Sequence, residues 1–508
     1  MHYYIGIDVG TSATKAIVVS QTGDILSSAS YEYPLYQPEN GWAEQEPSDW
    51  ANAALQALKD AVENSKADPE DIRGIGFSGQ MHGLVMVDED KKPLGRSIIW
   101  CDQRTGKQKD VISKKAGDER VLSVTGNRTN TSFTAAKILW VKENQPEFWE
   151  KCRWIMLPKD YVRLVLTGEI YTDVSDASGT QLMDVKNRCW SKEIVEALEI
   201  GMEKLPPIRE SCEACGHISP EVSMITGLSV NTIVAAGAAD NATAALGSRT
   251  FKEGDVFTTI GTSGVMFAHS KEYQADPKGR VHTLCAAVPG EYALMGVTQA
   301  AGLSLHWFRD EFCQDLVKEE KAGGRNSYAV LDEMASKVPI GANRLVYLPY
   351  LNGERTPCFD ENCRGTFVGL TAAHGRAEEV RAIMEGVAYS LKNSEDIFHD
   401  IHVDPKVMYL CGGGSSSPFW RQMFADVFNC ECRILSCTEG GSLGAAVLGA
   451  CAAGDFSSVE EACEALVPSE AKTILPDPSR HKEYLRTYEV YNKIYPALKG
   501  CYEELQKV

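Results

Sequence analysis

A carboxylate stands beside a run of glycine and hydroxyl residues close to the start of the chain. Asp8 ends an apolar segment, and Gly10, Thr11 and Ser12 follow before a second β-rich segment opens at Lys15. Glycine lets the backbone turn tightly, so that its amide and the neighbouring hydroxyls can point at phosphate oxygens. A carboxylate at a strand end can hold a metal ion or its water shell. The pattern predicts a phosphate and metal site, with a polar surface hairpin as the alternative.

The same hairpin pattern returns near the middle of the chain. A β-rich segment ends at Ile260, the turn Gly261-Thr262-Ser263-Gly264 follows, and an apolar segment continues to Ala268. Two copies of one strand–turn–strand unit, half a chain apart, predict a duplicated domain. Two such turns facing each other would bracket the phosphates of a nucleotide.

Asp240 is the candidate general base. It lies in the segment Gly237–Ala242, where small residues let a substrate come close. A hydroxyl group that attacks a γ-phosphate needs a positioned carboxylate to take its proton, and the rest of the rate comes from alignment and charge neutralisation. An Asp followed by Asn and Ala is also typical of a helix N-cap, and both roles can coexist.

A third glycine-rich loop spans Gly412–Ser417, between an expected strand and an expected helix. Its glycines would allow a flat ligand such as adenine to lie against bare backbone, and a simple glycine turn is the alternative. The chain has no P-loop motif. The segment Gly74–Gly79 matches the dinucleotide-binding pattern, but its first glycines fall inside an expected strand, so we reject that site.

Helices and strands alternate between these loops. Trp50, Ala54 and Leu58 share one face of a helix that follows Pro47, and we expect Ser48 to cap it. Tyrosines at helical spacing in the tail, 484–495, indicate a packed face. The order of elements predicts an α/β fold with two related domains and a cleft between them.

Composition narrows the class of protein. With 508 residues and 44% hydrophobic residues, two or three globular domains are expected. A net charge of −19 disfavours nucleic acid and anionic membranes as partners. No signal-like segment opens the chain, so we expect a cytoplasmic protein. The single C-x-x-C pair, Cys212 and Cys215, has no second pair at zinc-site spacing, which favours an ordinary loop.

These residues resemble the FGGY family of carbohydrate kinases, within the actin-like ATPase superfamily. The resemblance runs from Ile5 to Ala446. Ser132–Asn144 fits one family signature, and Gly365–Glu385 fits the other except that Glu379 replaces an apolar residue. The resemblance implies two ribonuclease-H-like domains, which we expect to divide into 1–246, mainly for the sugar, and 247–508, mainly for ATP.

The resemblance also implies roles for single residues. Asp240 would be the catalytic base, and Met81 and His82 would contact the sugar, with Asn241 beside them. From the residues alone, Trp100 and Asp102 offer a further face and a hydroxyl acceptor. ATP and Mg²⁺ would be held by residues of the three glycine-rich loops, with Asp8 at the metal: Asp8, Thr11, Ser12, Lys15, Gly261, Thr262, Gly413, Gly414 and Ser417.

Within the family the chain most resembles members that convert D-xylulose into D-xylulose 5-phosphate. The segments that carry this are Gly79–Gly83, Trp100–Arg104, Leu157–Tyr161, Asp173–Thr180 and Leu348–Pro357. The alternatives are a kinase for another polyol or sugar (ribulose, gluconate, glycerol or a six-carbon ketose), an actin-like ATPase that acts on a partner, and a sugar sensor without catalysis. The intact Asp8 and Asp240 argue against the sensor. A homodimer is expected from the family alone.

Overall fold

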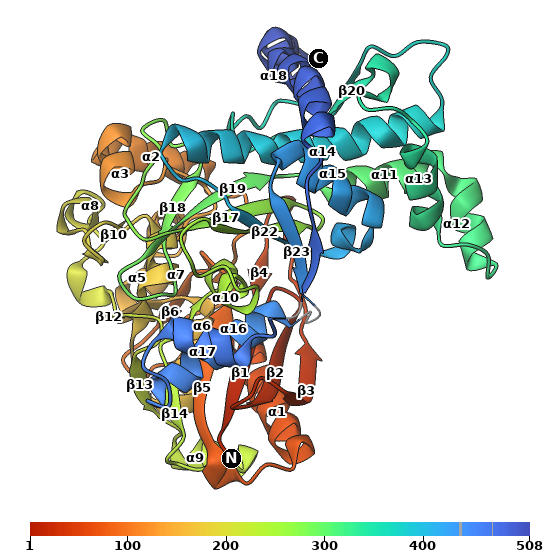
Figure 1. Ribbon diagram of the computed structural model, residues 1–508. Coiled ribbons are helices and arrows are strands. Elements are labelled where there is room, and N and C mark those ends of the chain that lie inside the picture. Colours follow the sequence, from red (N-terminus) through yellow and green to blue (C-terminus); the bar gives the residue numbers. More distant parts are fainter. Residues whose placement is uncertain (436–438, 470) are drawn as a thin grey trace.

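The computed structural model describes residues 1–435, 439–469 and 471–508, and they form two seven-stranded sheets stacked one above the other (Figure 1). In the first sheet β1 lies between antiparallel β2 and parallel β5. Its strand order is β13-β14-β5-β1-β2-β3, with β15 also paired to β5. The bounds are β1 Tyr3–Val9, β2 Ala13–Ser20, β3 Ile25–Glu32, β5 Ile72–Gly79, β13 Ala214–His217, β14 Ile233–Ala235 and β15 Ala238–Ala239.

The second sheet repeats this arrangement. Its β16 lies between antiparallel β17 and parallel β22, in the order β18-β19-β17-β16-β22-β23-β24. The shared topology explains the repeated hairpin and confirms the predicted α/β fold with two related domains. The bounds are β16 Asp255–Ile260, β17 Gly264–Ser270, β18 His282–Cys285, β19 Tyr292–Thr298, β22 Val407–Cys411, β23 Glu431–Leu435 and β24 Ala471–Ile474.

Two helices, α10 (Asp240–Gly247) and α16 (Gly440–Ala452), cross between the sheets (Figure 1). The helix α16 comes from late in the chain, yet it packs on β1 and β5 of the first sheet. Glycines permit this approach, because a Cβ on Gly6 would lie 1.7 Å from the Ser442 carbonyl oxygen. Apolar residues of both sheets and both helices form one hydrophobic core. The two halves of the molecule are therefore held together by buried apolar contacts.

Some of the other helices pack on the faces of the sheets, and others form an apolar cluster of their own. Trp50, Ala54 and Leu58 of α1 pack on Ile5 and Ile7, as their spacing predicts. The helices of the first half are α1 Pro47–Ser65, α2 Gly106–Ala116, α3 Asp118–Thr125, α4 Thr134–Asn144, α5 Pro146–Lys151, α6 Pro158–Thr167, α7 Val174–Ala177, α8 Lys192–Ala197 and α9 Pro220–Thr226. Those of the second half are α11 Gly302–Phe312, α12 Gln314–Lys321, α13 Ser327–Ser336, α14 Arg376–Asp400, α15 Pro418–Phe428, α17 Val459–Leu466 and α18 Pro478–Leu505.

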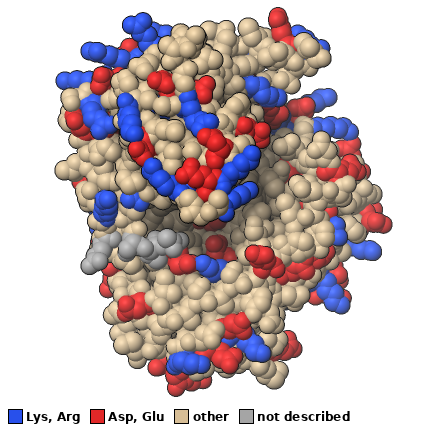
Figure 2. All heavy atoms as spheres, turned by 90° about the vertical axis from the view of Figure 1, so that its right-hand side faces the viewer, with Lys and Arg blue, Asp and Glu red and all other residues tan. Residues whose placement is uncertain are grey.

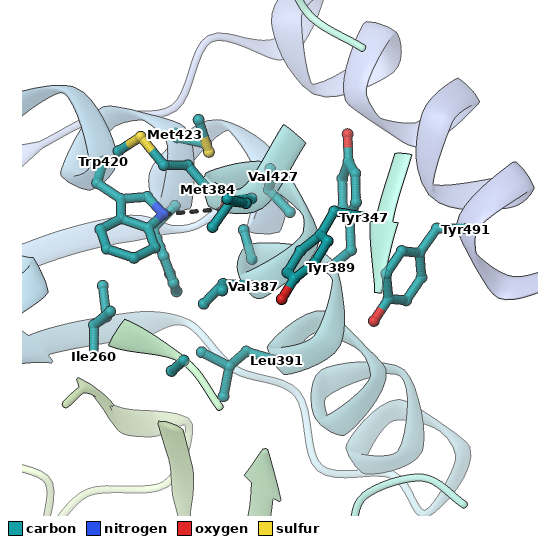
Figure 3. Close-up of a cluster of buried hydrophobic side chains, with 14 of the residues drawn as sticks. Ile260, Tyr347, Met384, Val387, Tyr389, Leu391, Trp420, Met423, Val427 and Tyr491 are labelled. Atoms are coloured by element: carbon teal, nitrogen blue, oxygen red, sulfur yellow. Dashed lines mark hydrogen bonds between the residues drawn. The ribbon is translucent and has the colours of Figure 1, made fainter. Parts of the chain in front are cut away.

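The long helix α14 carries the core of the second half. Tyr389 lies between Tyr347 and Tyr491 of α18, and the indole of Trp420 donates a hydrogen bond to the Met384 carbonyl at 3.1 Å (Figure 3). The predicted packing role of the tail tyrosines is therefore confirmed. Short paired strands complete the fold: β4 Glu44–Gln45, β6 Val85–Val87, β7 Ser97–Ile98, β8 Trp154–Met156, β9 Thr172–Asp173, β10 Met183–Asp184, β11 Cys189–Trp190, β12 Ile208–Arg209, β20 Val346–Leu348 and β21 Thr366–Val368.

The predicted N-cap of α1 was wrong by two positions, and the alternative interpretation of Asp240 as an N-cap was wrong by one. The N-cap of α1 is Glu46, so Ser48 lies inside the helix, because Pro47 itself occupies the first helical position. Asp240 is the first residue of α10 and Ala239 is its N-cap, so Asp240 does not cap the helix. The segment Gly74–Gly79 lies within β5, as predicted when the dinucleotide site was rejected.

Charged side chains of both signs are interspersed over the face shown in Figure 2, around a recess between the upper and lower parts of the molecule. Among the described residues, no helix is long and apolar enough to cross a membrane.

Candidate active site

Strand register brings the two candidate acidic residues together. Asp8 of β1 and Ala238 of β15 both pair with Ser78 of β5, from opposite sides. Asp240 follows β15 directly, so both carboxylates lie at the same edge of the first sheet. The Thr243 hydroxyl donates a hydrogen bond to the Ser78 hydroxyl at 2.8 Å, and Ser78 is in turn hydrogen-bonded to Asp8.

The environment of this pair favours proton uptake by Asp240. Burial raises its pKa to about 7, and the charge of Asp8 adds to the rise, although the Asn241 amide and side chain donate hydrogen bonds that oppose it. Burial also raises the pKa of Asp8, whereas Ser78 and Lys15 act in the opposite direction. A carboxylate that titrates near neutral pH suits a general base.

A buried layer of charged residues holds the strand that carries Asp240. The Ala239 amide donates to the Ser175 hydroxyl at 3.0 Å, and that hydroxyl donates to Asp173 at 2.5 Å. Asp173 also forms a 2.7 Å ion pair with Lys159, and both side chains are fully buried. Sequence reasoning assigned no role to these residues, although they lie in segments that carry the family resemblance. They fix the backbone at the candidate base.

The first hairpin turn is tied to the rest of the first half. The Thr11 hydroxyl accepts a hydrogen bond from the Trp100 indole at 3.0 Å, whereas Ser12 is exposed. Lys15 forms a 2.8 Å ion pair with Glu439, directly before α16. This ion pair connects the first sheet to the late part of the chain beside Asp8.

The second and third glycine-rich loops open into one cavity of about 840 Å³. All five residues predicted from these loops line it: Gly261, Thr262, Gly413, Gly414 and Ser417. A Cβ on Gly413 would meet no atom within 4 Å, so the backbone there is bare toward open space. The cavity is large enough for a nucleotide. Sequence reasoning missed the residues that α11 and α13 contribute, among them His306, Asn326, Tyr328 and Asp332.

Asp8 is the only residue that the sequence predicts as a metal ligand. Among residues 1–435, 439–469 and 471–508, no group of three or more His, Cys, Asp or Glu side chains could hold a metal ion. Mg²⁺ usually keeps several waters and binds through one or two carboxylates together with substrate phosphates. The side chains around Asp8 therefore fit a cation that arrives with a nucleotide, and they do not form a complete protein cage.

His82 is held rigidly in an unusual backbone conformation. Its φ is +68°, a region that a residue with a side chain rarely adopts. Its carbonyl accepts hydrogen bonds from Lys137 at 2.7 Å and from Thr134 at 3.2 Å. Its ring stacks on Phe133 with centroids 4.4 Å apart. This position therefore depends on α4, which contains most of the first family signature.

The ring of His82 is neutral. Burial places its pKa well below the usual value, and the charge of Lys137 lowers it further. Its Nδ1 donates to the Gly179 carbonyl at 2.9 Å, which leaves Nε2 as an acceptor. Met81 is buried beside it, 3.8 Å from the side-chain amide of Asn241, next to Asp240. Three of the five predicted sugar residues, Met81, His82 and Asn241, thus lie next to one another beside the candidate base.

Trp100 and Asp102 differ in what they offer. Trp100 is 39% exposed and donates only to Thr11. Asp102 is buried, and its carboxylate already accepts hydrogen bonds from Arg104 and from the Ala43 amide at 2.6 Å. The structure therefore places Asp102 in an ion pair that orders the loop, and not as an open hydroxyl acceptor.

Two residues of the second half, Arg355 and His282, lie near His82. An Arg355 nitrogen lies 3.4 Å from the Ser132 hydroxyl, and its charge acts on His82, Lys137 and His282. In the described part of the chain, no carboxylate lies within 4 Å of its guanidinium in an ion pair. Sequence reasoning quoted Arg355 within a motif but gave it no role, because nothing local shows that it reaches across to the first half.

Comparison with known proteins agrees with this geometry. The model of the N-terminal domain of the FGGY family of carbohydrate kinases matches residues 3–247, and that of its C-terminal domain matches residues 256–453. A xylulose kinase of Bacillus subtilis is 40% identical, over 98% of each chain.

Solved structures are similar over nearly the whole chain. A xylulose kinase from Rhodospirillum rubrum has a TM-score of 0.90 and 29% identity, covering 99% of this chain and 100% of its own. A gluconate kinase from Lactobacillus acidophilus has a TM-score of 0.90 and 28% identity, covering 99% of each chain. Together, the two sheets, the paired carboxylates and the matches to both domains mean that this chain belongs to the FGGY family of carbohydrate kinases.

Proposed function

We propose that this protein transfers the γ-phosphoryl group of ATP to the 5-hydroxyl of D-xylulose, giving D-xylulose 5-phosphate, with Asp240 as general base. The observation that carries the proposal is that Asp8 and Asp240 lie close together at one edge of the first sheet, with Met81 next to Asn241, in a molecule that also has a nucleotide-sized cavity. The high identity to a xylulose kinase over both full lengths supports the choice of sugar.

Each half of the site would have its own task. Asp240 takes the proton of the attacking hydroxyl, and Asp8 holds Mg²⁺ at the phosphates, where the metal neutralises developing charge. Thr11, Ser12, Lys15, Gly261 and Thr262 would surround the phosphates, and Gly413, Gly414 and Ser417 the adenosine. Contact of Arg355 with the first half would exclude water, so that ATP is not hydrolysed.

The far end of the sugar would meet neutral His82 and cationic Arg355. A keto oxygen accepts hydrogen bonds, and the guanidinium of Arg355 carries donors without a carboxylate partner within 4 Å in the described chain. The same observation favours a second candidate, a sugar acid such as gluconate, because a carboxylate would pair with that guanidinium. The similarity to a gluconate kinase supports testing it.

The proposal includes the organisation and setting of the protein. Residues 1–246 would bind mainly the sugar and residues 247–508 mainly ATP, a division supported by the two sheets and by the extents of the two family models. We place the enzyme in the cytoplasm, where ATP is available, and propose a homodimer by family analogy.

The test is ADP release from Mg-ATP with D-xylulose, D-ribulose, L-ribulose, glycerol and gluconate, against a blank without sugar. Strong stimulation by D-xylulose alone supports the proposal. Stimulation by gluconate would keep the base and the nucleotide site but replace the sugar. A rate equal to the blank with every compound would overturn the kinase and favour an ATPase that acts on a partner.

A further inference from the structure

One carboxylate in the wall of the large cavity has no role in the reaction described above. Asp332 belongs to α13, a helix outside both sheets, and it lines the cavity together with Ser417 of the third glycine-rich loop. In the described chain, no Lys, Arg or His lies within 4 Å of Asp332 in an ion pair. Its oxygens can therefore serve a ligand.

Asp332 and Ser417 lie close together in the wall of this cavity. The Ser417 oxygen accepts the Trp420 amide at 3.0 Å and so caps α15. Its proton is free for the hydrogen bond that it shares with Asp332. Burial raises the pKa of Asp332, and this hydrogen bond opposes the rise. A half-buried carboxylate has more acceptor positions than one hydroxyl can fill, and a ligand donor could occupy another of them.

The course of the loop shows which end of a nucleotide reaches Asp332. The loop starts against Ile260, where a Cβ on Gly414 would lie 2.4 Å from the Ile260 side chain. Ile260 directly precedes Gly261 and Thr262, the proposed phosphate turn. Ser417 lies at the other end of the loop, where α15 begins. A nucleotide with its phosphates at Thr262 would therefore present its base to Ser417 and Asp332.

We propose that Asp332 accepts a hydrogen bond from the exocyclic amino group of adenine and thereby selects ATP over GTP. Guanine carries a carbonyl oxygen at that position, and two acceptors facing each other are unfavourable. The inference uses the proposed function only in that ATP is the phosphoryl donor. The inference adds Asp332 as a specificity-determining residue. Asp332 lies outside the sequence motifs, so the sequence analysis did not predict it.

The test measures binding of MgADP and MgGDP by calorimetry in the full-length protein, without sugar. The wild type should prefer ADP. Asp332→Asn should weaken ADP binding about tenfold or more, the range for a hydrogen bond to a charged group, and should strengthen GDP binding, because the Asn amide can donate to the guanine oxygen. Glu311→Gln, which removes an exposed charge on α11, should change neither.

Two analogues separate the base from the ribose. Purine riboside diphosphate, which lacks the amino group, should bind wild type weakly and should lose nothing further in Asp332→Asn. The wild type and Asp332→Asn should share one ratio of ADP to 2′-deoxy-ADP affinity. An unchanged ADP-to-GDP ratio in Asp332→Asn, or a change in that deoxy ratio, would overturn the inference. These results do not depend on the sugar, whereas failure of the proposed function would appear as turnover that no sugar stimulates.

Discussion

Asp8 on β1 and Asp240 directly after β15 lie at the same edge of the first sheet, and the negative charge of Asp8 helps to raise the pKa of Asp240. Burial is the larger cause, and together they bring that pKa to about 7. In the proposed reaction, Asp8 would remain with the metal while Asp240 exchanges a proton near neutral pH. The relationship follows from strand register, since Asp8 and Ala238 pair with Ser78 from opposite sides and Asp240 follows two residues after Ala238.

The first prediction concerns the proton acceptor. Asp240→Asn keeps the shape of the side chain but cannot accept the hydroxyl proton, so turnover should fall on the order of 10² to 10⁴-fold. Affinity for the sugar should change little, because His82 and Met81 are untouched. Steady-state kinetics and sugar binding by calorimetry check both parts. Near wild-type turnover would remove Asp240 as the base.

The second prediction is a pH dependence. Below pH 7 Asp240 is mostly protonated and cannot act as a base, whereas above pH 7 it is ionised, because its pKa is raised to about 7. The kcat/KM for the sugar should therefore rise with pH, reach half its limiting value near pH 7 and level off about one pH unit higher.

The control is the residual activity of Asp240→Asn, which should not show this rise. If the variant kept the same rise between pH 6 and 8, another group would be responsible for it.

Much of the fold could be predicted because its signals are local. The two hairpins and the glycine-rich loop each lie within one short segment, and α1 has an apolar face at helical spacing. The position of Asp332 could not be predicted in this way. It depends on how α13 packs beside α15, and no motif in either helix shows that contact.

The residues predicted for the sugar site show the same contrast between local sequence signals and long-range contacts. One motif predicts Met81 and His82 as sugar residues, and the structure places Met81 beside Asn241. Arg355 stood inside a quoted motif, yet its role depends on contact with Ser132, more than two hundred residues earlier. Asp102 was expected to face the sugar, but its carboxylate accepts hydrogen bonds from Arg104, only two residues further along the chain. A sequence motif shows which side chains could take part in chemistry. It does not show whether another side chain already forms a hydrogen bond or ion pair with them.

The third prediction distinguishes the two candidate sugars through Arg355. Arg355→Met should raise the KM for the sugar on the order of 10- to 100-fold, because a hydrogen bond from a charged donor is lost. For a sugar acid, Arg355→Lys should restore much of the loss, since the charge remains. For D-xylulose it should restore less, because the planar fork of donors is missing.

Kinetics with both sugars at saturating ATP provide the measurement. Arg486→Met, which removes an exposed arginine on α18, is the matched control and should leave the KM unchanged. An unchanged KM in Arg355→Met would place Arg355 outside the sugar site.

The fourth prediction concerns the close contact between β5 and α16. A Cβ on Gly76 would lie 1.8 Å from the Ala445 carbonyl oxygen, so neither the strand nor the helix has room for a methyl group. Gly76→Ala should therefore destabilise the protein by about 3 kcal/mol, the upper part of the range for overpacking. Gly500→Ala, with no atom within 4 Å of the new Cβ, should be neutral or stabilising by up to about 1 kcal/mol. Denaturant midpoints measure both, and equal midpoints for the two variants would contradict the packing of α16 on the first sheet.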